Sequence, residues 1–203
     1  KPRYAKEARE VWTVVGELAN YLEDAGVRWD RAEITWDDVQ QKPGEWDWSF
    51  TDKMVDVYRK RGLSAFCLLQ GKAPWMKAPP ATGDERAQFA EFVYQTVNRY
   101  KADIHAWEIW NEPNIGTFWP QPNATDYAAL LKAAYDAAKK ADPACTVIMG
   151  GTSGVDIGFI TATLDAGGWN ACDAVSVHPY SMSGSPTSQG LPELLRQATA
   201  AVT

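Results

Sequence analysis

The stretch that decides this fold is Ile104-His105-Ala106-Trp107-Glu108-Ile109-Trp110-Asn111-Glu112-Pro113-Asn114. Its apolar first half predicts a short buried strand. The proline after Glu112 cannot donate to a continuing ladder, so the strand ends by presenting Asn111 and Glu112 side by side. In barrels of parallel strands and helices, the loops after the carboxyl ends of the strands build the active site. Turns also recruit Asn and Pro for local reasons alone, so a simple turn is the alternative interpretation.

The eight residues from Trp107 to Asn114 resemble the fourth-strand signature of a large clan of retaining glycoside hydrolases with a (β/α)8 barrel. The resemblance is closest to glycoside hydrolase family 39 and to related endoglycosidases that degrade exopolysaccharides. In that clan the Glu of Asn-Glu-Pro is the general acid/base, and the Asn before it contacts the 2-hydroxyl group of the sugar. The resemblance therefore implies a catalytic role for Glu112 and a substrate contact for Asn111.

Composition narrows the possible classes of protein. The chain has 203 residues, which suits a single domain over 1–203, and 45% of them are hydrophobic, which is enough for a sizeable core. The net charge of -6 and the absence of a Lys/Arg cluster argue against nucleic acid or an anionic membrane as partner. No apolar run approaches the roughly 18 residues that a transmembrane helix needs. We expect a soluble or already processed globular protein.

Tryptophan and cysteine add two expectations. Ten Trp residues are an unusual number, and although most should fill the core, indole faces also suit stacking on sugar rings. Cys145 and Cys172 each precede a predicted strand, which favours a disulfide at the bottom edge of the sheet, whereas Cys67 lies within an apolar strand and should be an inert thiol. No cysteine has a His or a second Cys at metal-ligand spacing, so we predict no metal site and no organic cofactor.

Hydrophobic periodicity predicts helices that alternate with strands. Strands are expected to begin near positions 27, 63, 104, 146 and 174. Helices are expected over 8–25, from 49 or 51 to 62, and over 84–100, 124–141, 157–166 and 192–202. Such alternation implies parallel pairing with right-handed crossovers.

The predicted fold is α/β, a (β/α)8 TIM barrel that is incomplete in this chain. A complete barrel takes about 250 residues, so about three strands are missing. By comparison with the family, the chain runs from about strand 2 to helix 6, preceded by helix 1, and lacks the first, seventh and eighth strands. A second chain or a missing segment would complete the barrel. An incomplete record of a longer protein is the alternative.

The segment from Arg31 to Trp36 resembles the second-strand segment of the same clan, where an Arg supports the nucleophile. The resemblance suggests that role for Arg31 and a substrate-binding role for Trp36. An ordinary ion pair of Arg31 with Glu108 or Glu33 is the alternative.

Other side chains are predicted to lie on the same rim. The exit of the strand near 63 delivers Trp75, and the loop after the central strand holds Trp119 between a glycine and a proline. Val-Ser-Val-His-Pro-Tyr, which ends at Tyr180, resembles the sixth-strand exit of the family, where such side chains line the sugar site. This implies substrate-binding roles for His178 and Tyr180.

The leading hypothesis is a retaining glycoside hydrolase that cleaves a polysaccharide or oligosaccharide by double displacement. This reaction needs a second carboxylate about 5 Å from the acid/base. In the clan that nucleophile ends the seventh strand, which this sequence does not contain. A non-catalytic carbohydrate-binding fragment is therefore the alternative function. A polymeric substrate and the expected disulfide together predict secretion.

Overall fold

The structure is a computed structural model that describes residues 20–76, 79–180 and 190–202. Five parallel strands form one sheet in the order of the chain: β1 (Trp29–Thr35), β2 (Ser64–Gln70), β3 (Ala106–Ile109), β4 (Thr146–Ser153) and β5 (Ala174–His178). All five predicted strands are confirmed. The helix predicted over 8–25 lies mostly outside the described residues, and its described part, 20–24, is helical.

Helices connect the strands and cover one face of the sheet. They are α2 (Trp36–Val39), α3 (Ser49–Arg61), α4 (Gly83–Tyr100), α5 (Ala124–Ala141), α6 (Ile157–Asp165) and α7 (Leu191–Ala201), with a short 3-10 turn, η1 (Gly168–Asn170). The five helices predicted after the first strand are confirmed, whereas α2 and η1 were not predicted. Among the described helices, none is both long enough and apolar enough to cross a bilayer.

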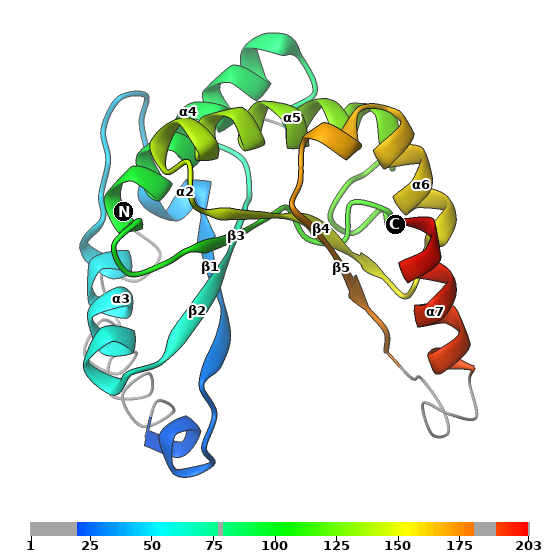
Figure 1. Ribbon diagram of the computed structural model, residues 1–203. Helices are drawn as coiled ribbons and strands as arrows, with labels where there is room; N and C mark the ends of the chain where they lie inside the picture. The colour runs from blue at the N-terminus through cyan, green and yellow to red at the C-terminus, as the bar shows by residue number, and fades with distance from the viewer. Residues whose placement is uncertain (1–19, 77–78, 181–189, 203) are drawn as a thin grey trace.

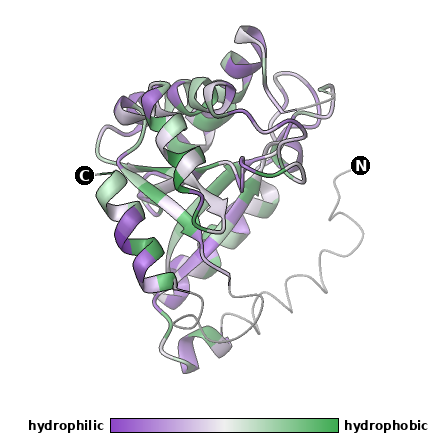
Figure 2. Cartoon of the chain, turned by 90° about the vertical axis from the view of Figure 1, so that its right-hand side faces the viewer, coloured by the Kyte–Doolittle hydropathy of each residue, from purple (hydrophilic) through white to green (hydrophobic). Residues whose placement is uncertain are grey.

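Local signals explain where the longer helices begin and end. Thr82 and Glu85 form a reciprocal capping box at the start of α4, and the side chain of Asn123 accepts from two backbone amides at the start of α5. Gly62 ends α3 in the left-handed conformation, at φ 62°. Figure 2 shows the helices striped in green and purple, as expected for helices with one apolar and one polar face.

The strand pleat separates two kinds of residue. Ile34, Leu69, Ile109 and Met149 face the helices and lie in the hydrophobic core. Residues one position earlier alternate to the other face, where Glu33, Leu68, Glu108 and Ile148 are in register. Figure 1 shows the sheet curved like part of a barrel wall, with helices α3 to α7 on the outside of the curve.

The predicted disulfide is not present. Both Cys145 and Cys172 are free thiols, and burial raises the pKa of each to about 11. The register supplies a reason. If the β4–β5 register is extended backwards from the Ile148–Ala174 pair, Cys145 lies opposite Ala171. Cys172 is therefore offset by one residue from the position opposite Cys145. Cys67 is the buried thiol that was predicted.

Candidate active site

The exits of β3 and β5 bring together the carboxyl and imidazole groups that the sequence singled out. Glu112 follows β3, His178 ends β5, and Oε1 of Glu112 lies 2.8 Å from Nδ1 of His178. The side chains of Glu112 and His178 are 10% and 13% exposed, so the pair is sheltered but still reachable. Neighbouring Asn111 is also buried. These three predicted site residues therefore share one rim of the sheet.

Arg31 holds the base of this site. Its Nε donates to Oε2 of Glu108 at 2.6 Å, and its NH2 group donates to Oδ1 of Asn111 at 3.0 Å. Of the two ion pairs that the sequence suggested for Arg31, with Glu108 or with Glu33, the structure contains the one with Glu108. Because the oxygen of Asn111 is turned to Arg31, the amide NH2 group of Asn111 is directed elsewhere as a donor.

Glu108 lies beneath the site, and the sequence identified it only as a possible partner of Arg31. It is fully buried, and its second oxygen accepts from the backbone amide of Gly151 at 2.8 Å. A buried charge needs such partners. Both carboxylate oxygens are engaged, so the structural role of Glu108 is to tie β1, β3 and β4 together beneath Glu112.

The backbone leaves β3 in an unusual conformation. Trp110 and Glu112 have φ values of 69° and 43°, and non-glycine residues in this region cost on the order of 1–3 kcal/mol each. The result is that Ile109 and Trp110 both lie in the core, whereas Asn111 and Glu112 contact the groups of the rim. The amide of Glu112 donates to the carbonyl of Gly151 at 2.9 Å, which fixes the turn.

Two glycines of β4 make this close approach possible. A Cβ atom on Gly150 would lie 2.3 Å from the carbonyl oxygen of Trp110, and one on Gly151 would lie 2.5 Å from Nε2 of His178. Neither contact is sterically allowed. Glycine inside a strand is a known sign of such close backbone approach.

Asn114 is a further residue whose role was not predicted. Its Oδ1 accepts from the amide of Ser153 at 2.9 Å, and its Nδ2 donates to Asp156 Oδ2 at 3.0 Å. It thereby joins the loop after β3 to the end of β4. The fourth residue of Asn-Glu-Pro-Asn thus holds the loop that carries Glu112.

Two of the predicted sugar-binding tryptophans belong to the core. Trp36 is 1% exposed and stacks on Phe92 with a centroid separation of 5.9 Å. Trp119 is 5% exposed and packs edge-on against Trp110. Both rings are buried among other aromatic side chains, so the prediction that Trp36 and Trp119 contact substrate is wrong for this structure. Both side chains pack in the aromatic layer between the sheet and the helices.

The other two predicted aromatic contacts remain accessible. Trp75 is 38% exposed, and its Nε1 donates to Oε1 of Gln88 at 3.1 Å. Tyr180 is 70% exposed, and its ring centroid lies 5.9 Å from that of His178. Tyr180 is therefore beside the Glu112–His178 pair.

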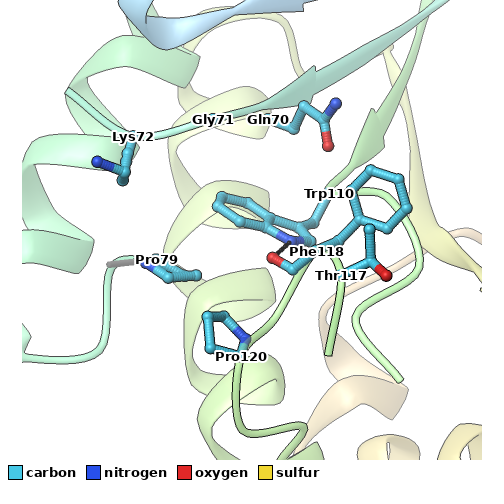
Figure 3. Close-up of a pocket in the computed structure, with 8 residues that line it drawn as sticks. All are labelled: Gln70, Gly71, Lys72, Pro79, Trp110, Thr117, Phe118 and Pro120. Atoms are coloured by element: carbon cyan, nitrogen blue, oxygen red, sulfur yellow. Dashed lines mark hydrogen bonds between the residues drawn. The ribbon is translucent and has the colours of Figure 1, made fainter. Parts of the chain in front are cut away.

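A pocket of about 310 Å³ lies next to this rim, at the exit of β2. Figure 3 shows the indole of Trp110 at its centre, facing two prolines; the lining residues are Gln70, Gly71, Lys72, Pro79, Trp110, Thr117, Phe118 and Pro120. Two of its polar groups already have partners: Trp110 Nε1 donates to the carbonyl of Phe118, and Lys72 Nζ donates to the carbonyl of Met76. Neither Glu112 nor His178 lines this pocket, so it is separate from their site.

Comparisons with known proteins bear on this arrangement. A family model described as cellulase (glycosyl hydrolase family 5) matches residues 14–200. None of the curated proteins matches the chain.

Three solved structures resemble it. A family 39 glycoside hydrolase from Bacteroides cellulosilyticus WH2 is 26% identical with a TM-score of 0.73, over 85% of this chain and 36% of that one. A monomeric β-xylosidase from Caulobacter crescentus CB15 is 20% identical with a TM-score of 0.74, over 93% and 45%. A GH39 enzyme from Xanthomonas axonopodis pv. citri is 20% identical with a TM-score of 0.73, over 92% and 44%.

The chain therefore spans less than half of the length of these three structures. Its parallel sheet and alternating helices match part of a TIM-barrel glycoside hydrolase, which confirms the predicted fold class. The family 5 model and the family 39 structures agree on the clan to which the sequence was compared.

Proposed function

Since this chain belongs to the cellulase family, glycosyl hydrolase family 5, we propose that it is the part of a retaining glycosidase that carries the general acid/base, Glu112. The observation that supports this most is the place of that carboxyl group. It lies at the carboxyl end of a parallel strand, is sheltered from solvent, and is 2.8 Å from an imidazole nitrogen. Proton transfer at such a rim is what glycoside hydrolysis requires.

The reaction would proceed in two displacements. A second carboxylate attacks the anomeric carbon while the bond to the leaving oxygen breaks and that oxygen takes the proton of Glu112. Water then attacks the same carbon and gives a proton to Glu112, and the second carboxylate leaves with its electron pair. Glu108 is unsuited to the nucleophilic role, because it is fully buried and paired with Arg31. We assign that role to a strand other than β1 to β5.

The remaining rim residues would hold the sugar. With its oxygen fixed by Arg31, Asn111 can direct its NH2 group at a hydroxyl group of the sugar. Tyr180 offers an exposed ring beside the catalytic pair, and amphipathic aromatic rings suit the apolar faces of sugars. Trp75 offers a second exposed ring farther along the rim.

The substrate that we propose is an oligosaccharide or polysaccharide. Two of the similar structures are described as β-xylosidases, and family 5 is described as cellulase. We therefore propose β-linked sugars as the first substrates to test. The predicted secretion rests on a polymeric substrate alone, because Cys145 and Cys172 are free thiols.

A second candidate function is carbohydrate binding without hydrolysis. It is favoured by the state of Glu108, which is fully buried and paired with Arg31 and so cannot serve as the second carboxylate. Calorimetry that detects saccharide binding while no hydrolysis occurs would select this candidate.

The experiment that tests the proposal compares the wild type with Glu112→Gln, in the protein at its full natural length. Both are assayed on 4-nitrophenyl β-xyloside and β-glucoside. General acid/base catalysis contributes about 10²- to 10⁴-fold, so kcat/KM should fall by that order. Glu193→Gln is the matched control, since Glu193 lies exposed on α7 and should leave the rate unchanged. Equal rates for the wild type and Glu112→Gln would exclude Glu112 as the acid/base.

A further inference from the structure

Tyr127 is a fully buried tyrosine of α5 whose hydroxyl group is bonded to two strands at once. It donates to the carbonyl of Ile109 on β3 at 2.7 Å, and it accepts from the amide of Gly150 on β4 at 2.7 Å. Its ring packs edge-on against Trp119 and lies tilted against Phe159. A helix side chain thus reaches through the aromatic layer to the backbone of the sheet.

The hydroxyl group lies where the regular ladder stops. The pairing of β3 with β4 ends at Ile109 and Met149, and the next pair would be Trp110 and Gly150. Trp110 has a φ of 69°, so β3 turns away at this point. The carbonyl of Ile109 and the amide of Gly150 would be left buried without a strand partner, and an unpaired buried polar group destabilises the fold. The hydroxyl of Tyr127 satisfies both.

The same two strands fix Glu112 immediately afterwards. The amide of Glu112 donates to the carbonyl of Gly151, and the amide of Gly151 donates to Glu108. Tyr127 therefore bonds to Gly150, one residue before Gly151, and to Ile109, three residues before Glu112. A change in the separation of Ile109 and Gly150 must move the peptide that holds Glu112.

Burial also keeps this hydroxyl group in the form that the geometry requires. It raises the pKa of Tyr127 well above its ordinary value, so the phenol stays neutral at working pH. A neutral hydroxyl can donate and accept at once, whereas a phenolate cannot donate.

We infer that Tyr127 is a positioning residue for Glu112, acting through the backbone of Ile109–Trp110 and Gly150–Gly151 without touching substrate. This rests on the proposed function, because it assumes that Glu112 transfers the proton. It differs from a purely structural role in one consequence. Loss of the hydroxyl group should impair proton donation to the leaving group more than it impairs binding or nucleophilic attack.

The test is Tyr127→Phe in the protein at its full natural length, which keeps the ring and removes both hydrogen bonds. The matched control is Tyr135→Phe on the same helix, because no hydrogen bond of the Tyr135 hydroxyl is found among the described residues and its ring packs near Lys139. Each variant is assayed on two glycosides of one sugar. The 2,4-dinitrophenyl leaving group departs without a proton, whereas the phenyl leaving group needs one.

For Tyr127→Phe we expect kcat/KM on the phenyl glycoside to fall at least tenfold more than on the dinitrophenyl glycoside. Tyr135→Phe should change neither. Equal losses on both substrates, or a lower melting temperature with no loss at all, would overturn the inference and leave Tyr127 a stabilising residue only. Replacement of Tyr127 by 4-aminophenylalanine, which restores a donor at the same place, should recover part of the selective loss.

Two further outcomes are separated by design. If the loss of activity in Glu112→Gln does not depend on the leaving group, both the proposed function and the inference about Tyr127 are wrong. If Glu112→Gln shows that dependence and Tyr127→Phe does not, only the inference fails.

Should Tyr127→Phe not fold, the 4-aminophenylalanine variant decides. A leaving-group dependence greater than that of the wild type supports positioning, and an unchanged dependence contradicts it.

Discussion

Nδ1 of His178 and Oε1 of Glu112 lie 2.8 Å apart, although 66 positions separate the two residues in the sequence. The contact joins the exit of β3 to the end of β5. A protonated Glu112 can donate to this nitrogen, and an ionised Glu112 can accept from it, depending on the tautomer. The bond can therefore persist in both of the protonation states that the proposed role of Glu112 requires.

His178 should orient Glu112, so His178→Ala should lower kcat/KM on phenyl glycosides by about 10- to 100-fold, the order of loss that follows from misplacing a catalytic group. The control is His105→Asn, because His105 is the other histidine of the chain and lies exposed before β3. Steady-state kinetics checks both variants. An unchanged rate in His178→Ala would show that the contact has no part in turnover.

Gly151 should tolerate no side chain. A Cβ atom there would lie 2.5 Å from Nε2 of His178 and 3.0 Å from Oγ of Ser176. We expect Gly151→Ala to displace His178 and to lower kcat/KM by about 10- to 100-fold. Gly158→Ala is the matched control in α6, where the nearest atom would be 3.6 Å away. It should retain activity and leave the free energy of unfolding unchanged or up to about 1 kcal/mol higher.

The buried charge of Glu108 should matter for stability. Glu108→Gln removes the partner of Arg31, whose side chain is 32% exposed. Breaking a fully buried pair costs about 3–5 kcal/mol, and partial exposure of Arg31 reduces this to about 2–3 kcal/mol in the free energy of unfolding. Urea denaturation measures it. Asp136→Asn, which breaks an exposed pair with Lys132 on α5, should cost no more than about 0.5 kcal/mol. Equal losses in both variants would contradict the account of Glu108.

Asp52 should make stability sensitive to acid. Arg99 donates to both of its oxygens, at 2.8 and 2.7 Å, and these bonds hold the pKa of Asp52 below its usual value. A lowered folded pKa contributes stability above the unfolded pKa, near pH 4, and that contribution is lost as the pH falls through the folded pKa.

Because Asp52 is 43% exposed, Asp52→Asn should cost only about 0.5–1 kcal/mol at pH 7. The difference from the wild type should shrink below pH 4. Urea titrations at pH 7 and pH 3 measure it, with the exposed Asp165→Asn as control. A difference that grows at pH 3 would mean that the sign is wrong.

The sequence predicted the elements well, because strands and helices are set by periodicity and end signals. The apolar run over β2 and the spaced apolar residues of α4 are local features. The position of Glu112 at the exit of β3 was predictable because the proline that follows it cannot continue the strand. Trp36 and Trp119 were misassigned because an indole ring suits a core and a sugar equally well, and only the fold decides between them.

Contacts that depend on two distant segments could not be read from the sequence. The approach of Gly150 to Trp110 follows from a left-handed tryptophan, a conformation that this residue type seldom adopts. The two bonds of Tyr127 join three elements, and helical periodicity alone does not predict such bonds. The expected disulfide failed on a register difference of one residue.

The proposed function depends on proton transfer by Glu112 in a retaining reaction. The most direct test is Glu112→Ala in the protein at its full natural length, assayed on a 2,4-dinitrophenyl glycoside with and without sodium azide. The substitution leaves space for azide, which can attack the glycosyl intermediate and displace the second carboxylate. We predict that azide raises turnover at least tenfold and that the product is a glycosyl azide with the configuration of the substrate. Turnover equal to that of the wild type and insensitive to azide, with no glycosyl azide formed, would contradict the account.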